Sequence, residues 1–295
     1  MTLKKIFRNK GSQISVLPET GTARLEGLDM ARALAIFGMV LVNFKIVMWD
    51  HMSGATWLIK LAGFFEGKAA ATFVVLAGIG IALLTRKALI SNDPLLRKQK
   101  RNNLIKRAIF LLITGLAYTP LWPADILHFY GIYILVAAFI IYKKPRWILG
   151  AGFLVIPVFL ILFCLIPYEQ GWDFSTLTYL DLWSAEGMVR HLIYNGFHPV
   201  FPWLFFILFG LWYGRQDFSN RNFQKKTLAW SAGILILVEA IIRTSPQWID
   251  WTGIGIPAVH IPYFFGTSPM PPLPLYLVSG TASALVIISI SLLLF

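Results

Sequence analysis

An acid and a histidine that could move protons together stand close in the chain. Asp125 and His128 are three residues apart in Pro123-Ala-Asp-Ile-Leu-His128. Their side chains share one face if the segment is helical. An acid beside a histidine fixes the tautomer of the ring and raises its basicity, which suits general-base catalysis. Capping of a helix start by Asp125 explains the same spacing equally well, so both interpretations stay open.

A second histidine lies in a stiff segment. His198 begins the run His198-Pro-Val-Phe-Pro-Trp203, in which two prolines and a tryptophan are typical of the point where a chain enters a membrane. His198 is a candidate for proton transfer, although an interfacial structural role explains the same pattern. The sequence carries no CxxC, HExxH or GxxxxGK[ST] motif, so we expect no metal.

The elements that must position these groups follow from composition. The chain has 295 residues, of which 57% are hydrophobic and 14% charged, about half the charged share of a soluble domain. Its mean hydropathy is +0.67. These values exclude a soluble enzyme and predict an all-α, polytopic integral membrane helix bundle in the lipid bilayer. About eight transmembrane helices are expected, at 29–49, 64–84, 105–121, 126–142, 147–166, 199–214, 228–243 and 273–295.

The charges predict an orientation. The net charge is +12, and most basic residues fall before the first apolar run and in every second connection, as cytoplasmic loops require. We therefore expect both termini in the cytoplasm, a cytoplasmic tail at 1–28, a transmembrane domain at 29–295 and no nucleic-acid partner. Gly78 and Gly80 lie within the second run and predict close helix packing.

Several segments resemble one family. The run from Arg24 to Asn43, RLEGLDMARALAIFGMVLVN, resembles the opening signature of membrane acyltransferases related to heparan-α-glucosaminide N-acetyltransferase. Two departures are visible: Ala31 replaces the usual Leu and Ala33 the usual Gly. The runs Pro123–Gly131 and His198–Trp203 are similar to the YeiB-like bacterial branch of that family.

The resemblance implies a function. Such enzymes transfer an acyl group, typically acetyl, from cytosolic acetyl-CoA or another acyl-CoA to an extracytoplasmic hydroxyl or amine acceptor, such as a glycan or a small molecule. The protein would lie in the bacterial inner (cytoplasmic) membrane, as a monomer or a homo-oligomer. In the heparan enzyme a histidine after the first span is implicated in catalysis, and His51, in Trp49-Asp50-His51, occupies the equivalent place here.

The resemblance also assigns roles. His51 would be the catalytic base, with Asp50, Asp125, His128 and His198 as further catalytic candidates. The phosphates of the donor would meet basic residues at the inner mouth, and the candidates are Arg24, Arg32, Arg107 and Arg215. A non-enzymatic transporter, a lipid-binding protein or a scaffold would use the same polar cavity without chemistry, and these alternatives remain open.

Overall fold

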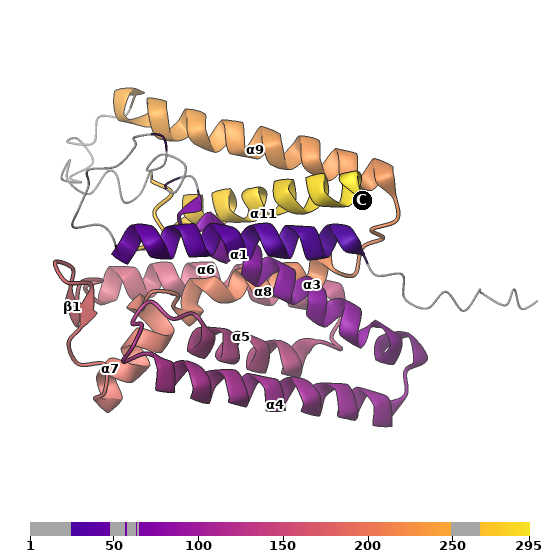
Figure 1. Cartoon of the computed structure of the whole chain (residues 1–295), viewed down its shortest axis with the longest axis horizontal. Coiled ribbons are helices and arrows are strands. Elements are labelled where there is room, and N and C mark those ends of the chain that lie inside the picture. Colours follow the sequence, from indigo (N-terminus) through magenta and orange to yellow (C-terminus); the bar gives the residue numbers. More distant parts are fainter. Residues whose placement is uncertain (1–24, 48–56, 58–62, 64, 249–265) are drawn as a thin grey trace, which may run out of the picture.

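The computed structural model describes residues 25–47, 57, 63, 65–248 and 266–295. Long helices pack side by side in an antiparallel bundle (Figure 1). This arrangement confirms the predicted all-α fold. The elements are α1 (Glu26–Val47), α3 (Lys68–Ser91), α4 (Pro94–Tyr118), α5 (Leu127–Ile140), α6 (Pro145–Leu165), the two-residue strands β1 (Trp172–Asp173) and β2 (Thr178–Tyr179), α7 (Ala185–Arg190), the π-helical turn η2 (His191–Asn195), α8 (Val200–Tyr213), α9 (Arg221–Trp248) and α11 (Pro274–Leu294).

Each of the eight apolar runs forms a helix, but these helices are not equally suited to cross a membrane. Within the described ranges, α1, α3, α6, α9 and α11 are long and apolar enough. A sixth candidate arises if α7, η2 and α8 count as one span bent by 47°. α5 has only 14 residues, short of the roughly 20 that a bilayer requires. The first half of α4 is basic.

Local signals explain where several helices begin. The Asp93 carboxylate accepts a hydrogen bond from the backbone N–H of Leu95 at 2.8 Å, and Pro94 occupies the first turn of α4. Proline also opens α6 and α11, where its missing N–H costs nothing. The predicted start of the third run, residue 105, was wrong, because α4 begins eleven residues earlier, at Pro94. These first residues include many charged side chains and therefore do not form part of an apolar run.

The centre of the bundle is the contact between α3 and α8. A side chain at Gly78 would place its Cβ 2.2 Å from the carbonyl oxygen of Ile207, and one at Gly210 would place it 2.1 Å from that of Val75. The two backbones therefore touch, which only glycine permits. The predicted close packing is confirmed for Gly78, whereas a Cβ at Gly80 would meet open space.

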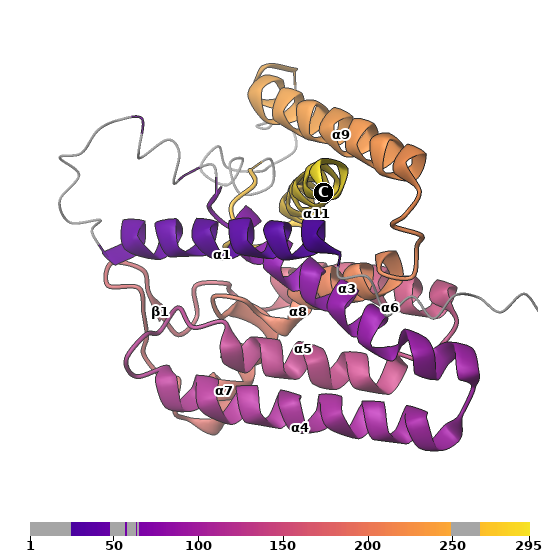
Figure 2. The same cartoon turned by 45° about the vertical axis from the view of Figure 1, so that its right-hand side comes forward.

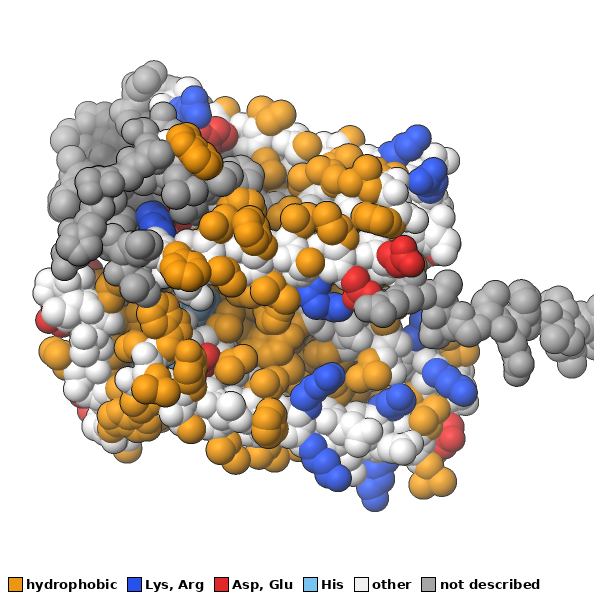
Figure 3. Space-filling view, in the orientation of Figure 1, with side chains coloured by type: hydrophobic (Ala, Val, Ile, Leu, Met, Phe, Trp, Pro, Cys, Tyr) orange, Lys and Arg blue, Asp and Glu red, His pale blue; other side chains and the backbone are white. Residues whose placement is uncertain are grey.

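The connections between helices divide into two groups. Those between α3 and α4, α5 and α6, and α8 and α9 all lie at the right-hand end in Figure 1, beside the C-terminus. Figure 3 shows Lys and Arg side chains gathered mostly toward the same end. The connection from α6 to α8, with β1, β2 and α7, lies at the opposite end. The basic connections thus share one end of the bundle, and its assignment to the cytoplasm stays a prediction.

Candidate active site

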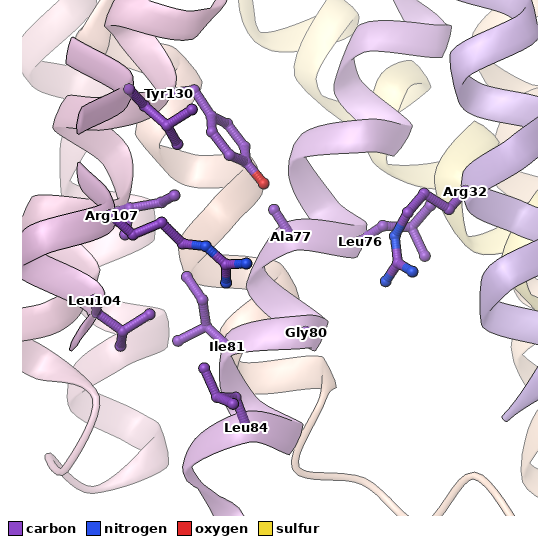
Figure 4. A pocket seen from close by; sticks show the side chains of 11 residues that line it. Arg32, Leu76, Ala77, Gly80, Ile81, Leu84, Leu104, Arg107 and Tyr130 are labelled. Carbon is purple, nitrogen blue, oxygen red and sulfur yellow. The ribbon is translucent and has the colours of Figure 1, made fainter. Parts of the chain in front are cut away.

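A cavity of about 470 Å³ opens within the basic half of the bundle. α1, α3, α4 and α5 supply its walls, and Arg32, Arg107 and Tyr130 are its polar members. Figure 4 shows Arg32 reaching inward from one side of α3, with Arg107 and Tyr130 approaching from the other. The structure thus brings together two of the four arginines expected to meet phosphates.

The two arginines of this inner cavity differ in how they are held. A nitrogen of the Arg32 guanidinium donates to the Asp29 carboxylate at 2.8 Å, one turn earlier on α1. Arg107 is exposed, and its guanidinium makes no hydrogen bond or ion pair with another described residue. Arg32 is therefore oriented by the protein, whereas the donors of Arg107 remain available to a ligand.

Of the other two arginines, Arg215 is not among the residues that line this cavity. Arg215 donates to the backbone carbonyl of Lys143 at 3.0 Å and to that of Ile141 at the end of α5. It therefore caps the last turn of α5, where unpaired carbonyls favour a cation. Arg24 lies outside the described residues.

Asp125 and His128 form a contact at the other end of α5. One oxygen of the Asp125 carboxylate accepts from the backbone N–H of Leu127 at 2.9 Å and from Nδ1 of His128 at 3.0 Å. Both side chains are buried. An ionised carboxylate can only accept, so Nδ1 of the ring is the donor in this contact. Capping and the acid–histidine pair occur together, and the two interpretations of this spacing do not exclude each other.

Two further histidines surround Phe129, the residue that follows His128. The ring of His191 lies 5.7 Å from that of His128, and the ring of His198 lies 5.9 Å from that of Phe129. Within the described part of the chain, His128 Nε2, His191 Nδ1 and His198 Nδ1 are buried without hydrogen-bond partners. Buried polar atoms of this kind require water or a ligand as a hydrogen-bond partner. Each of these three neighbouring rings therefore has a nitrogen with unused hydrogen-bonding capacity.

A network in the outer connection holds His191 in place. The amide of Asn195, in the same π-helical turn, donates to the backbone carbonyls of Tyr168 and Gln170, both at 2.8 Å. Tyr179 donates to the Asn195 side chain at 2.8 Å. Burial raises the pKa of the Tyr179 phenol, so this hydroxyl remains a donor at neutral pH.

Arg190 completes the network around Tyr179. Its guanidinium is buried and bonds to the Tyr179 hydroxyl at 2.9 Å, to Glu186 at 3.1 Å and to Asp181. Sequence reasoning selected neither Arg190 nor His191 as a site residue. Two ring neighbours of His191 lie on α5, whereas Arg190 stands four residues after Glu186 on the same helix. The one local signal is their position before the stiff run that starts at His198.

Two neighbouring cavities lie beside the histidines. The first, of about 240 Å³, is lined by His198, Glu66, Asn43 and Ser268 among apolar residues. The second, of about 510 Å³, is lined by Asp125 and Asn43 and is otherwise apolar or aromatic. Both have Met39, Asn43, Ala124 and Ile126 in their walls. We call them the outer pocket and the side groove. His51 and Asp50 lie outside the described residues.

Comparison with known proteins gives one match. The family model of the catalytic region of heparan-α-glucosaminide N-acetyltransferase matches residues 24–245, a range that includes the inner cavity and the three histidines around Phe129. No curated protein and no solved structure matches the chain. The match does not distinguish the YeiB-like bacterial branch, which stays a prediction.

Proposed function

Because the chain belongs to the heparan-α-glucosaminide N-acetyltransferase family, we propose that it is a membrane acetyltransferase with separate ends for donor and acceptor. Acetyl-CoA binds with its phosphates at the inner cavity. Its thioester extends along the bundle toward the outer pocket, where a hydroxyl or amine acceptor is acetylated. The acceptor class includes glycans and small molecules.

The observation that carries this proposal is that the same helices line both cavities. On α1, Arg32 borders the inner cavity and Met39 the outer pocket. On α3, Leu76 borders the inner cavity and Ala70 the outer pocket. Six or seven residues of helix span roughly 10 Å. One elongated ligand, charged at one end and reactive at the other, fits this arrangement.

The donor end suits phosphate. Guanidinium groups bind phosphate oxygens with two parallel hydrogen bonds, which gives both affinity and orientation. Arg32 and Arg107 approach the cavity from opposite sides (Figure 4), so phosphates bound in it would have a guanidinium group on either side. The basic connections at the same end attract the polyanionic donor over a longer range.

The acceptor end supplies a base. His198 lines the outer pocket, and the Tyr133 hydroxyl, bonded to the His198 backbone carbonyl, fixes its position. The imidazole takes the proton of the acceptor while the acceptor oxygen or nitrogen attacks the thioester carbon. The carbon–sulfur bond breaks, and the same proton passes to the departing thiolate, so that free CoA leaves. His51 remains the alternative base.

Purified protein in proteoliposomes tests the proposal with labelled acetyl-CoA and methyl glucosaminide as acceptor. Arg107→Gln should raise the KM for acetyl-CoA by about tenfold or more, since a hydrogen bond to a charged group contributes about 1.5–3 kcal/mol. The matched control is Arg101→Gln, an exposed arginine of α4 outside the cavity lining, which should leave KM unchanged.

Two histidine variants test the chemistry. Replacing the true base, His198→Gln or His51→Gln, should lower kcat by about a hundredfold or more with little change in acetyl-CoA binding. If folded wild-type protein binds neither acetyl-CoA nor longer acyl-CoAs, the acetyltransferase proposal fails. The transporter or scaffold interpretation would then replace it.

A further inference from the structure

We propose that the acceptor is an amphiphile that reaches the outer pocket from within the bilayer, with its hydrocarbon chain lying in the side groove. This inference rests on the proposed function and names its substrate class. It concerns a path between α1 on one side and the α4–α5 pair on the other.

The packing of the helices creates this path. α1 packs mainly against α3 and α11, whereas α4 packs mainly against α5. α1 therefore forms one wall of the path and the α4–α5 pair forms the other, with α3 between them. Figure 3 shows the result as an apolar hollow between α1 and α4 on the surface of the molecule.

The side groove has the lining that a hydrocarbon chain requires. α1 contributes Ile36, Val40 and Phe44, all of which are substantially exposed. Trp122 and Leu127 lie on the opposing wall. Side chains of this kind favour alkyl groups over water, and their exposure places the groove at the surface of the bundle.

The polar groups of the groove lie where it meets the outer pocket. Asn43 and Ala124 line both cavities, so the two spaces adjoin. Beyond them, His198 and Glu66 supply hydrogen-bonding groups. A molecule with an apolar tail in the groove would therefore place a polar head beside the proposed base.

The aromatic side chains of the side groove also support the approach of the acceptor from within the bilayer. Tyr118 and Trp122 line its wall at the end of α4, and Leu121 beside them is 79% exposed. Tyrosine and tryptophan concentrate where the hydrocarbon meets the headgroups. An amphiphile in the outer leaflet would have its own polar head at this level.

A lipid acceptor explains the groove better than the donor does. The phosphates of the donor are assigned to the inner cavity, and an acetyl group has only two carbons, too few for a space of about 510 Å³. A water-soluble acceptor would not need an opening toward the bilayer. The groove is therefore assigned to the tail of the acceptor.

The first test compares two acceptors, dodecyl β-glucosaminide and methyl β-glucosaminide, with the full chain in lipid nanodiscs and labelled acetyl-CoA. The kcat/KM for the dodecyl compound should exceed that for the methyl compound by about tenfold or more. Ala124→Phe and Val40→Trp fill the groove and should reduce this ratio several-fold. Phe37→Trp is the control: Phe37 is exposed on α1 but does not line the groove, so its ratio should equal that of the wild type.

The second test measures occupancy without turnover. Val40→Cys in a Cys164→Ser background, which removes the chain's single native cysteine, is alkylated by a bilayer-soluble maleimide. Dodecyl glucosaminide should slow the alkylation several-fold and methyl glucosaminide should not. Phe37→Cys should be unaffected by either compound.

The outcomes separate this inference from the proposed function. Transfer to methyl glucosaminide without a chain-length preference, and without protection of Val40→Cys, would overturn the amphiphilic acceptor and leave the acetyltransferase intact. Protection by octanoyl-CoA but not by dodecyl glucosaminide would assign the groove to the donor and also overturn it. Protection by dodecyl glucosaminide with no transfer to any acceptor would support the binding path and refute the acetyltransferase.

Discussion

Replacing Asp125 by alanine should destabilise the protein far more than an ordinary helix-cap substitution. The carboxylate accepts from two backbone N–H groups, those of Leu127 and His128, a cap that contributes about 1 kcal/mol. It also accepts from Nδ1 of His128 at 3.0 Å, and a bond to a charged acceptor contributes about 1.5–3 kcal/mol. Alanine leaves this buried N–H without a partner, and the two losses together amount to about 2.5–4 kcal/mol.

Asp93 provides a matched control. It caps α4 through the backbone N–H groups of Leu95 and Leu96, as Asp125 caps α5, but it is exposed and has no histidine partner. Asp93→Ala should therefore cost only about 1 kcal/mol. The difference between the two variants isolates the buried contact with His128.

Thermal unfolding of the purified variants, followed by fluorescence-detected size-exclusion chromatography, measures this difference. At about 2–4 °C per kcal/mol, Asp125→Ala should lower Tm by roughly 5–16 °C and Asp93→Ala by a few degrees. Equal losses in the two variants would mean that the His128 contact contributes nothing beyond capping. The reasoning about the buried pair would then be refuted.

Three further predictions follow from packing, charge and topology. Gly210→Ala should lower Tm strongly, because its Cβ would lie 2.1 Å from the Val75 carbonyl oxygen. Gly233→Ala in α9, with open space around it, should leave Tm unchanged or raise it. Equal effects of the two substitutions in a thermal scan would contradict the close contact. Arg190→Met should expose the segment around β2 to proteases, since the guanidinium donates hydrogen bonds to Tyr179 and Asp181. Glu186→Gln, at a position 81% exposed, should change the cleavage little. Limited proteolysis followed by mass spectrometry measures the difference between the two variants. In a Cys164→Ser background, Asn92→Cys and Ser219→Cys should react with an impermeant maleimide from one side of the membrane and Ser175→Cys from the other; labelling of all three from one side would refute the topology.

Local patterns in the sequence predicted most of the fold. Each apolar run became a helix because long apolar segments have few alternatives in a bilayer. The Asp125–His128 contact was accessible for the same reason, since both residues lie within one turn. The start of α4 could not be predicted from hydropathy, because its first half carries basic side chains that can extend into water while the backbone remains helical.

The cavities depend on contacts between distant segments, and no local pattern encodes them. Arg32 and Arg107 line the same cavity because α1 and α4 both flank α3, an arrangement set by packing rather than by spacing along the chain. His191 lies 63 positions after His128 in the chain, and it approaches His128 because a π-helical turn and the Asn195 network place it there. The arginines and histidines were identifiable as candidates, but their partners were not.

The shared wall formed by α3 constrains how the sequence can change over time. One inserted or deleted residue between Ala70 and Leu76 would rotate one part of the helix by about 100° against the other. One of the two lining faces would then point away from its cavity. Relatives that keep the same reaction should therefore tolerate length changes in the connection between β1 and β2, yet carry none in this stretch of α3. Substitutions there can be frequent, whereas a shift of register would separate the two cavities.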